Sequence, residues 1–313
     1  MSEKEPRLIG GGQLGAPPLE ASGPGEEHGK VQGRTQRQIV WRRFRRHQLA
    51  MISGAILLLL YLAAIFGPML APYGYSQIDY NAFSQGPSLA HPMGTDQLGR
   101  DELTRVIYGG RVSLMVGLSV GVFSTLIGAI FGIVSGFYGG RLVDVGIVGF
   151  TDFMLVLPNL PLLIVAGSIF RLNAVTISIL LVALSWMTIA RVVRGQVLSL
   201  RNREFVMAAQ AIGVSKAMIM ARHILPNVVG VMVVQTTLAV GLTILAESAL
   251  SFLGLGIQPP TPSWGNLLSD AQSTMTQQWW LAVFPGVMII LTVLCVNFLG
   301  DGLRDALDSK AVE

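Results

Sequence analysis

The chain has 313 residues, of which 51% are hydrophobic and only 13% are charged. This balance is typical of a polytopic membrane protein and argues against an ordinary soluble domain. The formal net charge is +4, and long acidic or basic tracts are absent, so nucleic acid is not indicated as a partner. Cys295 is the only cysteine, which excludes an internal disulfide, and the histidines lack metal-site spacing.

Residues 1–38 are rich in Gly, Pro, Glu and Gln and lack hydrophobic periodicity, so we expect a disordered cytoplasmic tail. A G-x-G-x-x-G match at residues 10–15 has no strand before it and no helix after it, which argues against a dinucleotide site. Residues 39–72 follow as a basic interfacial segment and the first span. In that segment Trp41 and Phe44 alternate with arginines that can bind anionic lipid headgroups.

Apolar runs of about 20 residues, the length at which an α-helix crosses the hydrocarbon core, recur along the rest of the chain. They predict an all-α membrane protein with about six transmembrane helices, because runs of this length are too long for barrel strands. The expected spans are Leu49–Leu70, Val112–Phe137, Val145–Phe170, Ala174–Val193, Val228–Leu253 and Leu281–Leu299.

The distribution of Lys and Arg predicts that both termini lie in the cytoplasm. Basic residues precede the first span, flank the fourth and fifth, and follow the sixth, whereas the loop from Gly254 to Trp280 contains none. The loop from Ala71 to Arg111 carries both signs of charge and is placed outside. The expected division is 73–110 for the extracytoplasmic loop, 111–302 for the transmembrane domain and 303–313 for a cytoplasmic C-terminal tail.

A polar stretch at about residues 201–226 separates the fourth and fifth spans, and we expect two short helices there, joined at Gly213. Asn202 is the expected N-cap of the first helix, and Ser215 that of the second. The expected apolar face consists of Phe205, Ala208, Ala209 and Ile212, at helical spacing. Its alanines let a partner's backbone approach closely, which favours a docking surface over a helix lying on the bilayer.

The run Met207-Ala208-Ala209, followed by Gly213 and then Leu225-Pro226, resembles the "EAA" loop of permease subunits of bacterial ABC importers. The resemblance implies a cytoplasmic coupling helix that docks into a groove of an ATPase subunit. The coupling residues that it implies are Glu204, Phe205, Met207, Ala208, Ala209, Ile212, Gly213, Val214 and Ser215. Met207 occupies the slot that usually holds the family's glutamate, so docking should rest on shape and apolar contact.

Three further segments, at residues 91–111, 251–265 and 300–308, resemble the dipeptide/oligopeptide/nickel branch of that family, and its C-type subunit in particular. This implies the type I ABC importer fold in a bacterial cell membrane. The implied partners are a second homologous permease, two cytoplasmic ATPase subunits or domains that bind ATP and Mg, and an extracytoplasmic solute-binding protein. Peptides are the expected substrate, with nickel or another small solute as the alternative.

The chain is not expected to be an enzyme or to hold a cofactor or metal itself. It has no G-x-x-x-x-G-K-[ST] phosphate loop and no catalytic cluster of side chains. A secondary transporter working alone is the less favoured alternative, since it would need broken helices and ion-coordinating residues at mid-span.

Three residues are candidates for the gate or the translocation path: Glu247, Asp152 and Pro158. A carboxylate at membrane depth must face protein or water, so Glu247 either lines the path or holds the turn that follows the fifth span. Pro158 is expected to kink the third span, either for gating or for packing.

Overall fold

The computed structural model describes residues 36–170 and 173–307. Residues 36 onward form one compact unit, built almost entirely from α-helices. Within the described residues, the β-structure is limited to an isolated bridge between Thr95 and Asp101.

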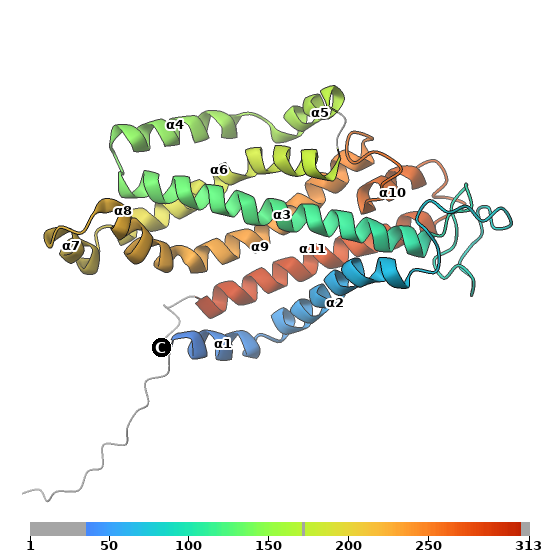
Figure 1. Cartoon of the computed structure of the whole chain (residues 1–313), viewed down its shortest axis with the longest axis horizontal. Coiled ribbons are helices and arrows are strands. Elements are labelled where there is room, and N and C mark those ends of the chain that lie inside the picture. The colour runs from blue at the N-terminus through green and yellow to red at the C-terminus, as the bar shows by residue number, and fades with distance from the viewer. Residues whose placement is uncertain (1–35, 171–172, 308–313) are drawn as a thin grey trace, which may run out of the picture. The chain divides into compact units, whose positions relative to one another are not determined.

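The helices are α1 (Gln36–Arg46), α2 (Gln48–Leu70), α3 (Glu102–Phe137), α4 (Leu142–Val156), α5 (Asn159–Ile169), α6 (Ala174–Leu200), α7 (Glu204–Ala211), α8 (Lys216–Ile219), a π-helical turn η1 (Met220–Ile224), α9 (Leu225–Phe252), α10 (Trp264–Ala271) and α11 (Trp280–Leu307) (Figure 1).

Each expected span is largely helical. Five helices (α2, α3, α6, the continuous run α8–η1–α9, and α11) are long and apolar enough to cross a membrane. The bent pair α4 and α5 makes six if it is counted as one span, which agrees with the expected number.

Several helices extend past the expected divisions of the chain. Most of the predicted tail 1–38 lies outside the described residues, but α1 begins at Gln36, inside it. The loop 73–110 ends early because α3 begins at Glu102, where the Asp101 carboxylate caps the helix by accepting from Thr104 N. At the other terminus α11 continues to Leu307, past the expected end at 302. Each extension is too polar to be recognised from an apolar run alone.

α3 is the central helix and packs against α2, α4, α6, α9, α10 and α11. Five of its glycines face the two neighbours that it contacts most closely: Gly117 and Gly121 face α9, and Gly128, Gly132 and Gly136 face α6. A Cβ at Gly132 would lie 2.6 Å from the carbonyl oxygen of Ala190, so the two backbones are in direct contact there. Small residues that allow such contact drive helix association in membranes, where lipid removes the hydrophobic driving force.

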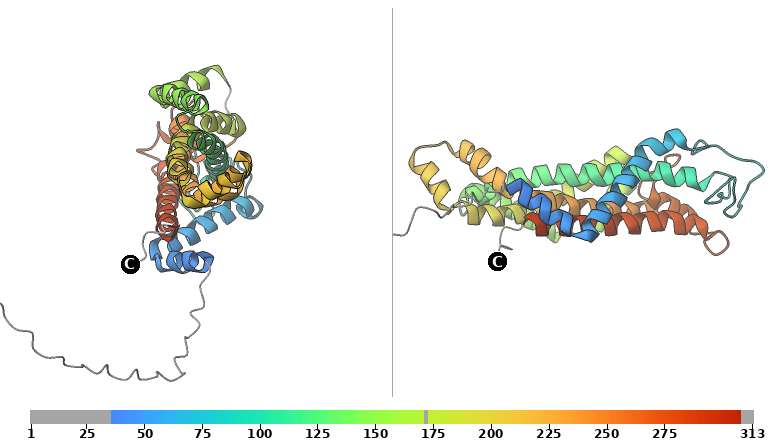
Figure 2. Two further views of the ribbon diagram at one scale, coloured as in Figure 1. Left: turned by 90° about the vertical axis from the view of Figure 1, so that its left-hand side faces the viewer. Right: turned by 90° about the horizontal axis from the view of Figure 1, so that it is seen from below.

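α4 and α5 form an arm at the rim of the bundle, on the side opposite α1 and α2 (Figures 1 and 2). The chain bends by 78° between them at Pro158, so the third span is broken rather than merely kinked as predicted. Pro158 is the N-cap of α5, with ψ at 117°, because proline cannot continue the hydrogen-bond ladder of α4. The arm is attached near its start, where the Asp144 carboxylate accepts two bonds from Arg194 of α6, at 2.7 and 2.8 Å.

The described unit has two ends. One, the knob end, carries α7, α8, α1 and the last turns of α11, where Gly230 of α9 lies against Leu307. The other, the loop end, carries residues 71–101 and 253–279 and the short helix α10 (Figure 1). Lys and Arg gather at the knob end, on α1, α6, α8 and η1.

We expect Gly132→Leu to destabilise the bundle, because the larger side chain must push α3 away from α6. Overpacking of this kind costs about 1–3 kcal/mol. The measurement is the melting temperature of the protein purified in detergent. Gly146→Leu is the matched control, since a Cβ at Gly146 meets nothing within 4 Å. Equal melting temperatures for the two variants would contradict the packing role of Gly132.

Candidate functional site

The polar stretch between α6 and α9 folds as a compact knob, as predicted. α7 begins after Arg203, which is the N-cap in place of the expected Asn202 and makes no side-chain cap bond. α7 ends at Ala211, and Gly213 just beyond it has a φ of +81°, in the left-handed region that favours glycine. Gly213 N donates to Gln210 O and Val214 N to Ala209 O, each at 3.0 Å, which together form a Schellman cap. The knob is thus locally self-supporting.

α8 follows directly. The Ser215 hydroxyl accepts from Met218 N at 3.4 Å, which confirms the expected cap. The expected second helix is only four residues long and passes through the π-helical turn η1 into α9, where Pro226 sits in the first turn. Proline has no backbone N–H, and the π-helical turn that precedes Pro226 is where the regular i→i−4 ladder is interrupted. The knob is therefore continuous with a membrane-spanning helix.

The face of α7 that contacts the bundle differs from the expected apolar face. Val206, which the sequence reading left out, is fully buried, and Ala209 is 5% exposed. Both pack in a cluster with side chains of α3, α6, α8, η1 and α9. Ala209 therefore faces its own bundle and is not available for docking to a partner. The spacing of apolar residues along α7 did not show which face is buried, because Phe205 and Val206 are adjacent and both apolar.

The outer surface of the knob carries apolar side chains exposed to solvent. Ile212 is 81% exposed, Met207 is 51% exposed and Phe205 is 42% exposed. The other predicted coupling residues on the surface are Glu204, Ala208, Gly213 and Ser215, and Val214 is half-buried. An apolar patch at an end rich in Lys and Arg is a typical protein-contact surface. Eight of the nine predicted coupling residues thus remain at least partly exposed.

The knob is also fastened to its surroundings by two contacts that involve aromatic rings. The Lys216 ammonium lies 5.7 Å from the centre of the Tyr138 ring, just beyond the C-terminus of α3. The rings of Phe205 and His223 are 6.5 Å apart between centroids. These contacts join α7 to η1, and α8 to the end of α3.

The three candidate gate residues do not form one site. Asp152 of α4 forms an ion pair with Arg191 of α6, both more than half exposed, beside a cleft of about 530 Å³ between α3, α4 and α6. Pro158 lies at the break after α4, and Glu247 lies on α9. Asp152 and Pro158 belong to the arm, and Glu247 to the bundle core.

Glu247 is fully buried. Its carboxylate accepts from Ser251 Oγ at 2.8 Å and from Ser113 Oγ at 3.1 Å. The same two hydroxyls accept from the backbone: Ser251 Oγ from Ile257 N, and Ser113 Oγ from Trp264 N. The geometry is that of an anchor for the segment after α9, the second of the two interpretations weighed for Glu247.

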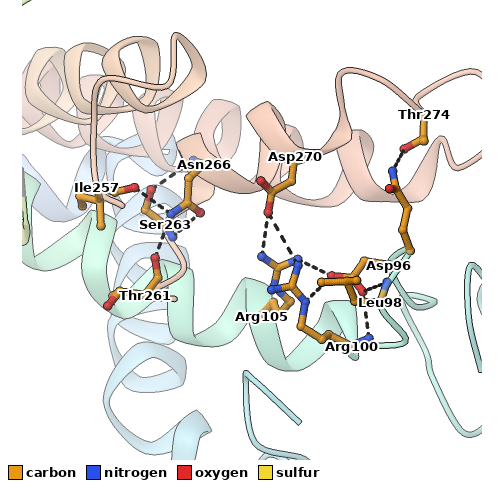
Figure 3. A network of polar contacts seen from close by, with 11 residues as sticks. Asp96, Leu98, Arg100, Arg105, Ile257, Thr261, Ser263, Asn266, Asp270 and Thr274 are labelled. Atoms are coloured by element: carbon orange, nitrogen blue, oxygen red, sulfur yellow. Dashed lines mark hydrogen bonds and ion pairs between the residues drawn. The ribbon is translucent and has the colours of Figure 1, made fainter. Parts of the chain in front are cut away.

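A network of ion pairs at the loop end was not foreseen (Figure 3). Buried Arg105 donates to Asp96 at 2.7 Å and to Asp270 of α10 at 2.9 Å, and Arg100 Nε donates to Asp96 at 2.6 Å. Beside it, Asn266 bonds the backbone at Ile257, Thr261 and Ser263. The balanced charges of residues 71–111 were the available signal, and Asp96, Arg100 and Arg105 among them prove to be paired within the protein.

Comparison with known proteins gives matches over most of the chain. Residues 128–313 match the family described as "Binding-protein-dependent transport system inner membrane component". Residues 35–87 match the "N-terminal TM domain of oligopeptide transport permease C".

Two curated relatives illustrate the similarity. The oligopeptide transport system permease protein OppC of Haemophilus influenzae is 42% identical over 286 residues, which cover 91% of this chain and 92% of the relative. The dipeptide transport system permease protein DppC of Bacillus subtilis is 42% identical over 274 residues, which cover 87% of this chain and 85% of the relative.

We expect Glu247→Ala to loosen the segment 254–263, because the two serine hydroxyls lose a buried acceptor. Leaving buried polar groups unpaired costs about 1–3 kcal/mol. The measurement is the rate of protease cleavage within residues 254–263 of the purified protein, which should rise roughly tenfold for 1.4 kcal/mol. Glu247→Gln keeps an oxygen acceptor and should show a smaller rise. An unchanged rate in Glu247→Ala would show that the carboxylate does not anchor this segment.

Proposed function

Because the chain belongs to the family of inner-membrane components of binding-protein-dependent transport systems, we propose that it is a permease subunit of an ATP-driven peptide importer. It pairs with a second, homologous permease to form the path across a bacterial cell membrane. A solute-binding protein delivers dipeptides or oligopeptides to this pair. Support for the peptide substrate comes from the relatives, which are named for oligopeptide and dipeptide transport.

The knob is the observation that carries the proposal. Its exposed apolar patch, formed by Phe205, Met207 and Ile212, stands at the end of a rigid body that is continuous with α9 and packed on α6. Such a surface suits docking into a groove of an ATPase subunit, and its rigidity suits transmission of movement. The chain has no phosphate loop, so ATP and Mg bind in the partner ATPase subunits.

The orientation follows from charge. The knob end collects most of the Lys and Arg and faces the cytoplasm, with both termini, as the positive-inside rule requires. The loop end, fixed by the Asp96–Arg105–Asp270 network and by Glu247, faces outward and receives the solute-binding protein. Because this outer surface is already ordered, binding of the solute-binding protein costs less conformational entropy.

Mechanistically, closure of the ATPase dimer draws the two knobs of the permease pair together. Because Val206 and Ala209 pack against α6 and α9, this movement reaches the spans through contacts that are already formed. Coupling in binding terms is reciprocal, so delivery of peptide at the outer face biases the ATPase in return. Asp152, Pro158 and the arm are the proposed moving part of the path, since the arm is joined to α6 by two ion pairs, Asp144–Arg194 and Asp152–Arg191, and has few buried residues.

We expect Ile212→Asp to weaken binding of the ATPase, because it places a charge in the centre of an apolar contact. The measurement is the amount of ATPase subunit that co-purifies with the tagged permease. Leu89→Asp is the control, because Leu89 is fully exposed at the opposite end. Full retention of the ATPase by Ile212→Asp would argue against docking at this patch.

We expect Gly213→Val to uncouple transport from ATP hydrolysis. No atom lies within 4 Å of a Cβ at this position, so a valine side chain would meet no steric clash there. The expected defect comes from the backbone, because valine disfavours the φ of +81° that Gly213 adopts. A left-handed conformation costs an L-residue about 1–2 kcal/mol, enough for a roughly tenfold loss of peptide-stimulated ATP hydrolysis. Gly213→Asn should retain more activity, since asparagine tolerates this region. Equal activity of Gly213→Val and the parent would contradict the requirement for this turn.

A further inference from the structure

A cavity of about 460 Å³ lies between α5, α6 and α9. Its polar lining residues are Asn159, Ser185, Thr188, Gln235 and Thr243, and the remaining wall is aliphatic. Its lining contains no charged side chain. The volume falls within the range of about 300–1,000 Å³ that is common for sites that bind small ligands.

The cavity lies deep in the membrane-spanning part. At 1.5 Å per helical residue, Ser185 is about 16 Å from the outer start of α6, and Gln235 about 15 Å from the inner start of α9. Both positions fall near the middle of a hydrocarbon core about 30 Å thick. Polar side chains at this depth require a polar neighbour or water.

Within the described part of the chain, the side chains of Ser185, Thr188 and Gln235 form no hydrogen bond. Neighbouring residues behave differently: Thr236 donates to Met232 O at 2.9 Å and Thr237 to Val234 O at 2.8 Å. The unpaired side chains of Ser185, Thr188 and Gln235 therefore lie together on the wall of one cavity. An unsatisfied polar group in hydrocarbon costs several kcal/mol, so lipid is a poor occupant.

The polar surface continues along α6 toward the cytoplasm. One face of α6, spaced by three and four residues, presents Ser185, Thr188, Val192, Gly195, Gln196 and Ser199. A helix face that contacted lipid would be apolar along its length. This face forms a strip from mid-membrane to the inner end, as a passage requires.

We propose that Ser185, Thr188 and Gln235 form the mid-membrane section of the translocation path and bind the passing peptide through its backbone amides. The inference rests on the proposed function as a peptide permease. Hydroxyl and carboxamide groups donate to amide carbonyls and accept from amide N–H groups. Every peptide carries these groups, so a neutral lining of this kind accepts peptides without regard to the charge of their side chains.

Cysteine accessibility tests whether the cavity contains water. Cys295 is the only native cysteine, so Cys295→Ala supplies a thiol-free parent. Thr188→Cys and Ser185→Cys are made in it, with Leu59→Cys, exposed on α2, as the control on a lipid-facing surface. In proteoliposomes with the complete complex, a membrane-impermeant methanethiosulfonate should modify the two cavity thiols at least tenfold faster than Leu59→Cys. Equal slow rates would overturn the proposal and indicate that lipid or a partner helix fills the cavity.

A charge placed in the cavity tests contact with the peptide. Thr188→Asp should favour cationic and disfavour anionic peptides. We expect the uptake ratio of Ala-Lys-Ala to Ala-Glu-Ala to rise at least fivefold over the parent. If Thr188→Asp still transports peptides and this uptake ratio is unchanged, the proposed contact between residue 188 and the peptide is wrong. Absence of tripeptide uptake by the parent complex would instead contradict the proposed function, whereas the thiol rates would still report on the path.

Discussion

The close contact of α3 with α6 and α9 is the constraint on which the other features of this protein depend. In lipid, moving an apolar side chain from the hydrocarbon to a helix interface gains little free energy. Helices therefore associate where small residues let their backbones come into close contact. The glycines of α3 provide that approach on two sides, toward α9 near the loop end and toward α6 near the knob end. The helices that meet the knob and those that line the cavity are thereby held by the same central element.

This arrangement separates a rigid body from a movable one. Val206 and Ala209 seat the knob in a core shared by α3, α6 and α9, and close-packed cores transmit displacement rather than absorb it. The arm α4–α5 lies outside that core, and Thr151, Asp144 and Leu163 are its only buried residues among those described. In the proposed mechanism, a movement that enters at the knob is taken up at the arm, which has few buried residues.

Sequence reasoning recovered the spans, the knob and the Gly213 turn, because each depends on local signals: apolar length, capping and positive φ. It missed α10 although Ser263 and Asn266 form a capping box, since the prolines around them indicated only a turn. It assigned Ala209 to the partner surface, because the helical spacing of apolar residues shows that α7 has an apolar face but not whether the bundle or a partner covers that face. The ion pair of Asp270 with Arg105 joins residues 165 positions apart along the chain, so no local pattern could show it.

Two sets of polar side chains differ in whether the chain itself provides their hydrogen-bond partners. At the loop end Asp96, Arg105, Asn266 and Glu247 are paired within the chain, which stabilises one conformation. At mid-membrane the polar groups of the α6–α9 cavity have no partner among the described residues, so their hydrogen bonds are available to whatever passes. A carrier for peptides of varied sequence needs this combination, because a fixed entrance keeps its docking geometry while a neutral, unpaired lining discriminates little among side chains.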